Sequence, residues 1–341
     1  DEFKNWVWQD DERRERLHRH YNDHFNNIRN INYDGSHLKL PGKNPAIELR
    51  PHQKNAAWQV ITTGNGLLGH EVGTGKTYTM IAAAMELRRL GLAKKPAIVC
   101  KKANVDSITA DALKLYPGAK ILSTADMFDA KSRKATISRI ATGDYDMVIL
   151  THDHMDLMGM KPETQRKYIK EELAELEAAH AQAFAESKGD KGNRVVKQLA
   201  KAKESLEAKL KESIDATAKD DAINFEDTGI DQLFVDEAHR YKSLPVYTKM
   251  QNLKGVPTSR SDRATNMLMR ARWLQENNGG RGVVFATFQP LLSPPRRSAS
   301  ATRQSVMKTS LNIAWPVISL SGRTSTAPGW CMSKANHVMP W

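Results

Sequence analysis

The sequence predicts an α/β fold, in which a parallel sheet is covered by helices on both faces. From residue 49 onward, short apolar runs alternate with stretches of helical periodicity, and this alternation is typical of strand–helix–strand units. One apolar run leads into a glycine-rich turn and then a helix, as in a phosphate-binding loop. The chain of 341 residues, 40% hydrophobic and 26% charged, is globular and long enough for one large or two ordinary domains.

The individual elements follow in order along the chain. Residues 1–48 are polar and aromatic, and we expect a mostly helical N-terminal extension with a helix over 10–28 and a turn at YDGS. Residues 49–288 form the predicted α/β domain. Its strands are expected at 67–69, 97–100, 120–122, 147–151, 233–236 and 283–287. Its helices are expected at 76–90, 104–115, 131–142 and 262–277.

Residues 161–215 interrupt this domain with two charge-rich helical stretches, separated by KGDKGN at 188–193. In the second stretch, apolar residues recur at the three-to-four spacing of a coiled-coil seam. We therefore predict a helical-hairpin insertion with arms of roughly 35 Å, at about 1.5 Å per residue. It is either a solvated spacer or an arm that touches DNA or a protein partner. The seam residues are Val195, Leu199, Ala202, Leu206 and Leu210.

The stretch GLLGHEVGTGKTYTMIAAAMEL at 66–87 is a candidate phosphate-binding loop. In such a loop the free N–H groups at a helix start point at the phosphates, and glycines let the backbone approach them. Lys76 would supply a positive charge and the Thr77 hydroxyl a magnesium ligand. The strict pattern has a glycine where this chain has His70, a position that mainly serves turn geometry. The residues expected to bind nucleotide are Gly73, Thr74, Gly75, Lys76 and Thr77.

A second motif, QLFVDEAHRYKSL at 232–244, places adjacent carboxylates at the end of an apolar run. Parallel α/β sheets bind their ligands at the carboxyl ends of the strands. Asp236 would hold magnesium there, and Glu237 would polarise the attacking water. An acidic pair after a strand is by itself more often a helix N-cap. Its combination with a phosphate-binding loop favours catalytic roles for Asp236, Glu237 and Lys76.

These motifs resemble those of superfamily-2 helicases and translocases. GHEVGTGKT and VDEAH are similar to motifs I and II of that superfamily, in which the first glycine is commonly replaced. ELRPHQKNAAWQ at 48–59 resembles the Q motif, which implies that Gln53 contacts adenine. AIVCKK at 97–102 and YDMVILTH at 145–152 lie where DNA-contacting motifs occur, and GVVFAT at 282–287 leads into motif III. The implied DNA contacts are Lys101, Lys102, Thr151 and His152. The alternative for the two lysines is that they are solvated charges of a loop.

The order of the motifs gives a closer match over 1–287. It resembles the Swi/Snf-like, DEAH-box helicase segment of large phage and plasmid proteins, the DarB-type antirestriction proteins among them. The resemblance implies a RecA-like lobe, ATP and Mg²⁺ as cofactors, and double-stranded DNA bound without sequence preference. It also implies that His239 couples the nucleotide site to DNA. Because such proteins often include an N6-adenine DNA methyltransferase, a fused or associated methyltransferase is an expected partner.

Residues 289–341 differ from the rest of the chain in composition. They hold six Lys or Arg and no Asp or Glu, so 12 − 6 = +6 of the net charge of +12 belongs to residues 1–288. Motif III and a second RecA-like lobe would follow in the family, and 53 residues are too few for a lobe. We therefore expect an aberrant, out-of-frame or disordered basic tail. The alternative is a basic arm that binds nucleic acid.

We expect the chain to contain the ATP-binding first lobe of a DNA-dependent ATPase or translocase, as a fragment of a larger DNA-processing protein. The resemblance implies that a second lobe supplies a catalytic arginine, so weak or no hydrolysis is expected of this chain alone. The alternative is a non-catalytic DNA-binding or scaffolding fragment that keeps the motifs. Two cysteines and the lack of a long apolar run favour a reducing, cytoplasmic setting without a membrane span.

Overall fold

The centre of the fold is a six-stranded, all-parallel sheet with the strand order β1-β6-β5-β2-β4-β3. The computed structural model describes residues 6, 9–25, 31–124, 130–186, 194–215, 224–244 and 261–287. All six predicted strands are confirmed, and each boundary lies within one residue of its predicted position. The strands are β1 (Gly66–Leu68), β2 (Pro96–Cys100), β3 (Ile121–Ser123), β4 (Met147–Thr151), β5 (Gln232–Val235) and β6 (Val283–Ala286).

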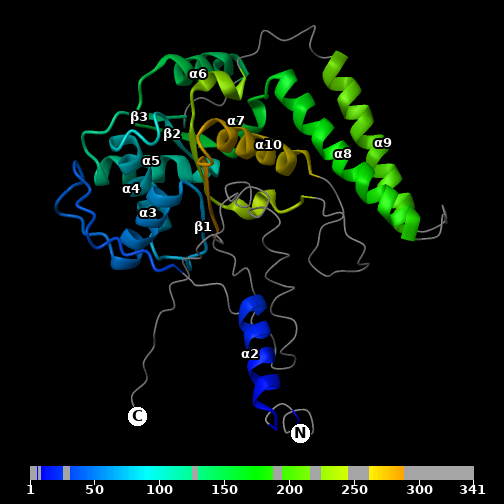
Figure 1. Ribbon diagram of the computed structural model, residues 1–341. Helices are drawn as coiled ribbons and strands as arrows, with labels where there is room; N and C mark the ends of the chain where they lie inside the picture. The colour runs from blue at the N-terminus through cyan, green and yellow to red at the C-terminus, as the bar shows by residue number, and fades with distance from the viewer. Residues whose placement is uncertain are drawn as a thin grey trace.

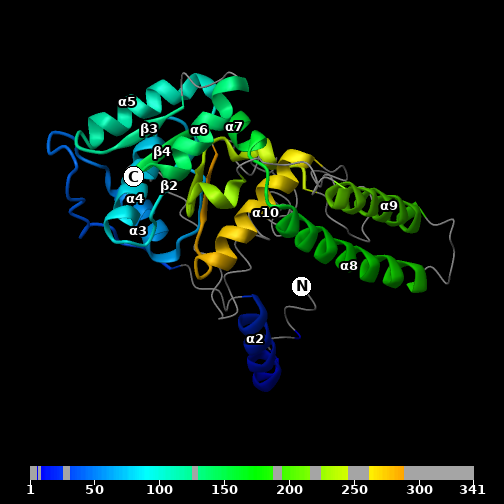
Figure 2. The ribbon, with the colours of Figure 1, turned by 90° about the horizontal axis from the view of Figure 1, so that it is seen from above.

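Helices cover both faces of this sheet, which explains the nearly continuous apolar runs in its central strands. Alternate residues of β2 point to opposite faces, so Ile98 packs with one hydrophobic core and Val99 with the other. The first core lies under α3 (Pro51–Thr63), α4 (Lys76–Arg89) and α5 (Val105–Leu115). The second lies under α6 (Ala130–Thr142), α7 (His152–Leu157) and α10 (Asp262–Asn277). These two helical layers are visible on either side of the strands in Figure 1 and Figure 2.

The helices predicted within the domain are confirmed as α4, α5, α6 and α10, whereas α3 and α7 were not predicted. α3 carries recognisable signals at both ends, since Pro51 is its first residue and Gly64 ends it with a φ of 72°. α7 has only six residues and begins where the Thr151 hydroxyl accepts a hydrogen bond from the His154 N–H. So short a helix, directly after a strand, leaves too little periodicity to predict.

The N-terminal extension is less helical than predicted. α2 (Asp11–Phe25) confirms the helix expected over 10–28, but residues 31–48 form turns and irregular chain. Leu40 and Leu49 are each only 2% exposed and belong to the core beneath α3, α4 and α5. Asn44 donates a backbone hydrogen bond to the Leu115 carbonyl at 2.7 Å. Residues 31–48 therefore pack against the lobe without forming a helix of their own.

The predicted helical hairpin is confirmed as α8 (Pro162–Glu186) and α9 (Arg194–Asp215), which extend away from the sheet beside α10 (Figure 1). A seam that includes Leu176 and Leu206 joins the two arms. The base of α8 is fixed to α10, because Lys167 Nζ and Tyr168 Oη contact Glu276 Oε2 at 2.7 and 3.0 Å. Among the described residues, none of the helices, these long ones included, is apolar enough over its length to span a bilayer.

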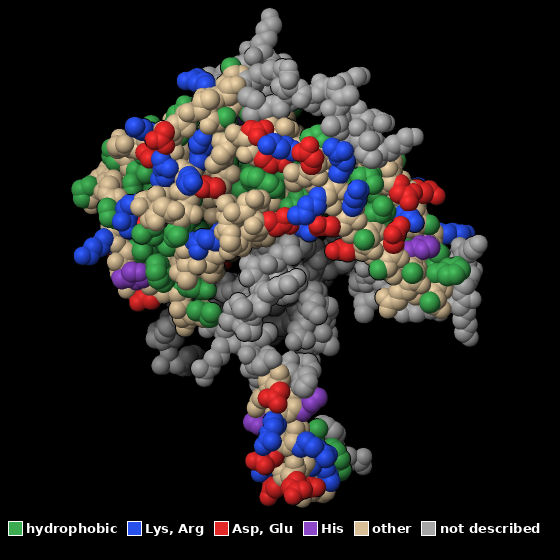
Figure 3. All heavy atoms as spheres, turned by 45° about the horizontal axis from the view of Figure 1, so that its top comes forward, with side chains coloured by type: hydrophobic (Ala, Val, Ile, Leu, Met, Phe, Trp, Pro, Cys, Tyr) green, Lys and Arg blue, Asp and Glu red, His purple; other side chains and the backbone are tan. Residues whose placement is uncertain are grey.

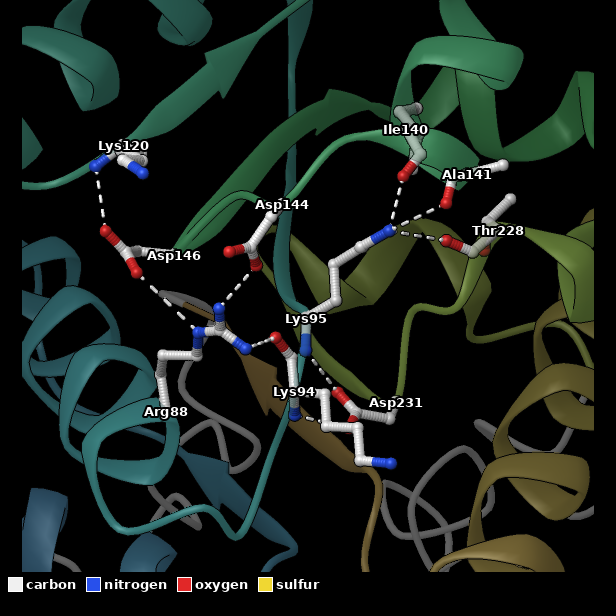
Figure 4. A network of polar contacts seen from close by, with 10 residues as sticks. All are labelled: Arg88, Lys94, Lys95, Lys120, Ile140, Ala141, Asp144, Asp146, Thr228 and Asp231. Atoms are coloured by element: carbon white, nitrogen blue, oxygen red, sulfur yellow. Dashed lines mark hydrogen bonds and ion pairs between the residues drawn. The ribbon is translucent and has the colours of Figure 1, made fainter.

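A polar network holds the amino-terminal edge of the sheet, opposite the predicted site (Figure 4). The Asp231 carboxylate accepts hydrogen bonds from the backbone N–H groups of Lys94 and Lys95, so it joins the starts of β5 and β2. The Lys95 ammonium group turns the other way and donates to three backbone carbonyls. These carbonyls belong to Ile140, Ala141 and Thr228. The network thus fixes the two neighbouring strands whose opposite ends reach the site.

Replacement of Asp231 by Ala should lower the free energy of unfolding by about 1–3 kcal/mol, because two backbone donors lose their acceptor. Urea denaturation followed by circular dichroism measures this. Asp144→Ala is the matched control, since that carboxylate is 81% exposed and pairs with Arg88 at the surface. It should cost less than about 1 kcal/mol. Equal losses in the two variants would contradict the role assigned to Asp231.

Candidate nucleotide site

The candidate site lies at the carboxyl-terminal edge of the sheet, where three strand ends meet. β1 leads into the glycine-rich loop, β5 into the acidic pair, and β2 into Lys101. A single strand, β6, separates β1 from β5, and β2 is the other neighbour of β5. Because all these strands are parallel, the residues that follow them gather at one edge. Sequence positions 76, 101 and 236 are thereby brought together.

The glycine-rich loop has the backbone shape that a phosphate cradle needs. Gly73 and Gly75 both have a φ of 79°, in the left-handed region that favours glycine. A Cβ atom built on Gly75 would lie 2.3 Å from Gln53 Nε2, so any side chain here would displace the Gln53 amide from the loop. α4 starts at Lys76, and none of the described side chains caps its first turn. The N–H groups at this helix start are therefore available to an anion.

Lys76 folds back over the loop. Its Nζ donates to the backbone carbonyls of His70 at 2.8 Å and Glu71 at 3.0 Å. Burial lowers the pKa of Lys76, while the nearby carboxylates of Asp236 and Glu237 oppose that effect. The ammonium group therefore sits in the field of the acidic pair, as the predicted roles of these three residues require.

The acidic pair is fixed at the end of β5. The Asp236 N–H donates to the Val99 carbonyl at 2.8 Å, which extends the pairing of β5 with β2. Burial raises the pKa of Asp236, and the charge of Glu237 adds to this rise. Glu237 has a φ of 52°, one of two non-glycine residues with positive φ in the described part of the chain. Backbone strain of this kind costs about 1–3 kcal/mol and is concentrated at functional sites.

Both carboxylate oxygens of Glu237 face basic side chains. Oε1 lies 3.0 Å from Lys101 Nζ, and Oε2 lies 3.2 Å from His239 Nδ1. The Glu237 side chain is only 13% exposed, whereas that of Lys101 is 43% exposed. The structure thus brings together a residue predicted to act on water and a residue predicted to contact DNA.

Gln53 lies in the first turn of α3 and binds the loop itself. Its Nε2 donates to the carbonyls of Thr74 and Gly75 at 3.3 and 3.1 Å, and its Oε1 accepts from the Arg50 N–H. His52, which the sequence analysis did not single out, also reaches the Thr74 carbonyl, at 3.0 Å. Its place beside Gln53 at the start of a Pro-initiated helix was the available signal. The adenine contact of Gln53 stays a prediction.

Two of the predicted DNA contacts are wrong for this structure. Thr151 and His152 are each 1% exposed, so neither side chain faces a phosphate backbone. Thr151 caps α7, and His152 Nδ1 hydrogen-bonds the Tyr241 hydroxyl at 2.8 Å. That bond joins α7 to η4 (Ala238–Tyr241), the short helix that carries His239. The carboxyl-terminal position of β4 was predicted correctly, but a polar side chain there can serve the packing of the next element. Lys102, by contrast, is exposed.

Comparison with known proteins assigns the family. Residues 58–294, more than half of the chain, match a family model described as a probable helicase domain. The chain belongs to this helicase family. Residues 1–27 match a domain family of unknown function.

The chain is also 23% identical over 339 residues to Defense against restriction protein B of Escherichia phage P1. That match covers 86% of this chain and 14% of the relative, so the chain spans about one seventh of the relative's length. The predicted resemblance to helicase segments of large phage antirestriction proteins is thereby confirmed. The SWI2/SNF2 ATPase core of Sulfolobus solfataricus, solved with double-stranded DNA, is similar at a TM-score of 0.37 and 13% identity. This match covers 83% of this chain and 46% of that one, and at this score it carries no argument.

Two buried histidines should make the stability of the fold depend on pH. Burial lowers the pKa of His70 from 6.5 to about 4 and that of His152 from 6.5 to about 3. The unfolded chain therefore binds more protons than the fold below pH 6.5. The stability from the neutral histidines is complete above pH 6.5 and is lost as the pH falls toward 4 for His70 and toward 3 for His152.

Replacement of His152 by Gln should flatten this dependence by up to about 1.4 kcal/mol per pH unit. Urea unfolding at several values between pH 7 and pH 5 measures the slope. His18→Gln, which changes an exposed histidine of α2, is the matched control. An unchanged slope for His152→Gln would mean that His152 has the same pKa in the folded and the unfolded protein, which would contradict its burial as a neutral group.

Proposed function

We propose that this lobe binds ATP with Mg²⁺ at the β1–α4 loop, as the ATP-binding part of a DNA-dependent ATPase of helicase or translocase type. The observation that carries the proposal is the position of Lys76, which starts an uncapped helix and lies in the field of Asp236 and Glu237. A cation at a helix start, near two carboxylates, fits a nucleotide whose phosphates bind the helix and whose metal binds an acid. The family match supports the same reaction class.

The residues of the loop fit a metal–nucleotide complex. The described residues contain no group of three or more His, Cys, Asp and Glu side chains that would hold a metal by themselves. Mg²⁺ commonly binds through one or two protein groups together with substrate phosphates. Thr77 and Asp236 would be these groups here. Bound Mg²⁺ would neutralise negative charge on the phosphates.

The remaining residues divide the other tasks. Glu237 would accept a proton from the attacking water, a role in which a carboxylate must lie within hydrogen-bond reach of that water. Gln53, which already binds the loop backbone, would contact adenine beside the loop. His239 would connect Glu237 to the DNA-binding surface, in keeping with the 3.2 Å that separates its Nδ1 from Glu237 Oε2.

Double-stranded DNA is the proposed polymer partner, and the phage relative's printed name supports a role in defence against restriction. On the face drawn in Figure 3, Lys and Arg side chains are interspersed with Asp and Glu. That face has no field of a single sign, so binding there would depend on local clusters. Lys101 and Lys102, at the carboxyl-terminal edge, are the proposed contacts. A fused or associated DNA methyltransferase belongs to the same proposal, as does slow hydrolysis by this chain alone.

Removal of the Lys76 charge should weaken ATP binding at least tenfold, or about 1.4 kcal/mol, because the phosphates would then meet backbone N–H groups alone. Titration of Lys76→Ala with a fluorescent ATP analogue measures this. Lys94→Ala, which removes an exposed lysine at the opposite edge of the sheet, is the matched control. Equal affinities of the wild-type protein and Lys76→Ala would remove the nucleotide site and favour a scaffolding fragment.

A further inference from the structure

Lys101 lies both at the end of a central strand and at the edge proposed to bind DNA. It follows β2 directly and precedes the short helix η1 (Lys102–Asn104), at the edge where we propose that DNA binds. β2 pairs with β5 in a register that sets Val99 opposite Val235, so the residues after these two strands are neighbours. This register explains why Lys101 Nζ reaches Glu237 Oε1 at 3.0 Å across 136 positions of sequence.

This contact involves Glu237, whose carboxylate must be free to accept a proton in the proposed reaction. A general base must offer an oxygen lone pair to the water that it deprotonates. In this structure one oxygen of Glu237 faces the Lys101 ammonium group and the other lies 3.2 Å from His239 Nδ1. Glu237 is therefore restrained in the absence of DNA.

The Lys101 side chain is also accessible to an anion that could compete with Glu237. Its side chain is 43% exposed, while its partner is 13% exposed, so a solvent-borne anion can approach the lysine from the open side. Because the lysine end of this pair is open to solvent, a phosphate group can compete with Glu237 for it. Lys102, the next residue, is also exposed, so a DNA backbone would meet two adjacent lysines there.

We propose that Lys101 is a positioning residue that links DNA to the nucleotide site. It pairs with Glu237 when DNA is absent, and a backbone phosphate competes for its ammonium group and releases the carboxylate. This inference rests on the proposed function, and it adds the regulation of that site. By linkage, competition works in both directions: if DNA releases Glu237, the loss of the Glu237 charge must strengthen DNA binding.

A double-mutant cycle on DNA affinity tests this reciprocity without reliance on hydrolysis. Fluorescence anisotropy with a mixed-sequence duplex, in low salt and without nucleotide, compares the wild-type protein, Glu237→Gln, Lys101→Ala and the double variant. Glu237→Gln should tighten binding about two- to fivefold when Lys101 is present and have no effect in Lys101→Ala. Lys101→Arg keeps the charge and should restore the response to Glu237→Gln.

Asp153→Asn provides the matched control, because Asp153 is 66% exposed near the same edge and lies 4.0 Å from Arg240. Any gain from that substitution should be independent of Lys101. A gain from Glu237→Gln that is equal in both Lys101 backgrounds, or absent in both, overturns the competition while DNA binding itself stands. Failure of all four proteins to bind DNA would overturn the competition together with the proposed DNA partner.

Discussion

The parallel pairing of β5 with β2, and of β5 with β1 through β6, is the constraint on which the candidate site depends. Because the strands run the same way, the loop after β1, the acidic pair after β5 and Lys101 after β2 share one edge. The opposite edge holds this arrangement in place. There Asp231 joins the starts of β5 and β2 through the backbone of Lys94 and Lys95. Fixed strand starts set the register that brings charged side chains into contact at the other end.

The strands, the main helices and the glycine-rich loop were predictable because their signals are local. A buried strand between helices reads as a short apolar run, and Gly73 and Gly75 mark a turn whatever surrounds them. The pairing of Lys101 with Glu237 was not predictable, since it depends on strand order and on a register between distant segments. For the same reason the prediction that His152 contacts DNA was wrong. Whether a polar residue at a strand end faces solvent or Tyr241 is decided by how η4 packs.

Energetically unfavourable local features are concentrated at the same edge of the sheet. Glu237 adopts a left-handed backbone, and His70 is 2% exposed without a hydrogen-bond partner for either ring nitrogen among the described residues. An unbonded buried polar group costs about 1–3 kcal/mol. His70 stands where the strict loop pattern has a glycine, and its carbonyl accepts a hydrogen bond from Lys76. Deviations from local rules at one place, within a fold that otherwise obeys them, are typical of functional sites.

The central claim is that strand order brings Asp236 to the phosphates held at Lys76, so that both act on one metal–nucleotide complex. Titration of ATP with and without Mg²⁺, on the wild-type protein and Asp236→Asn, tests it most directly. If Thr77 and Asp236 share the metal with the phosphates, Mg²⁺ should tighten ATP binding about tenfold in the wild-type protein, or about 1.4 kcal/mol. Asp236→Asn should abolish that gain and leave metal-free binding nearly unchanged. An equal response to Mg²⁺ in both proteins would contradict the account, because the acidic pair would then lie outside the nucleotide site.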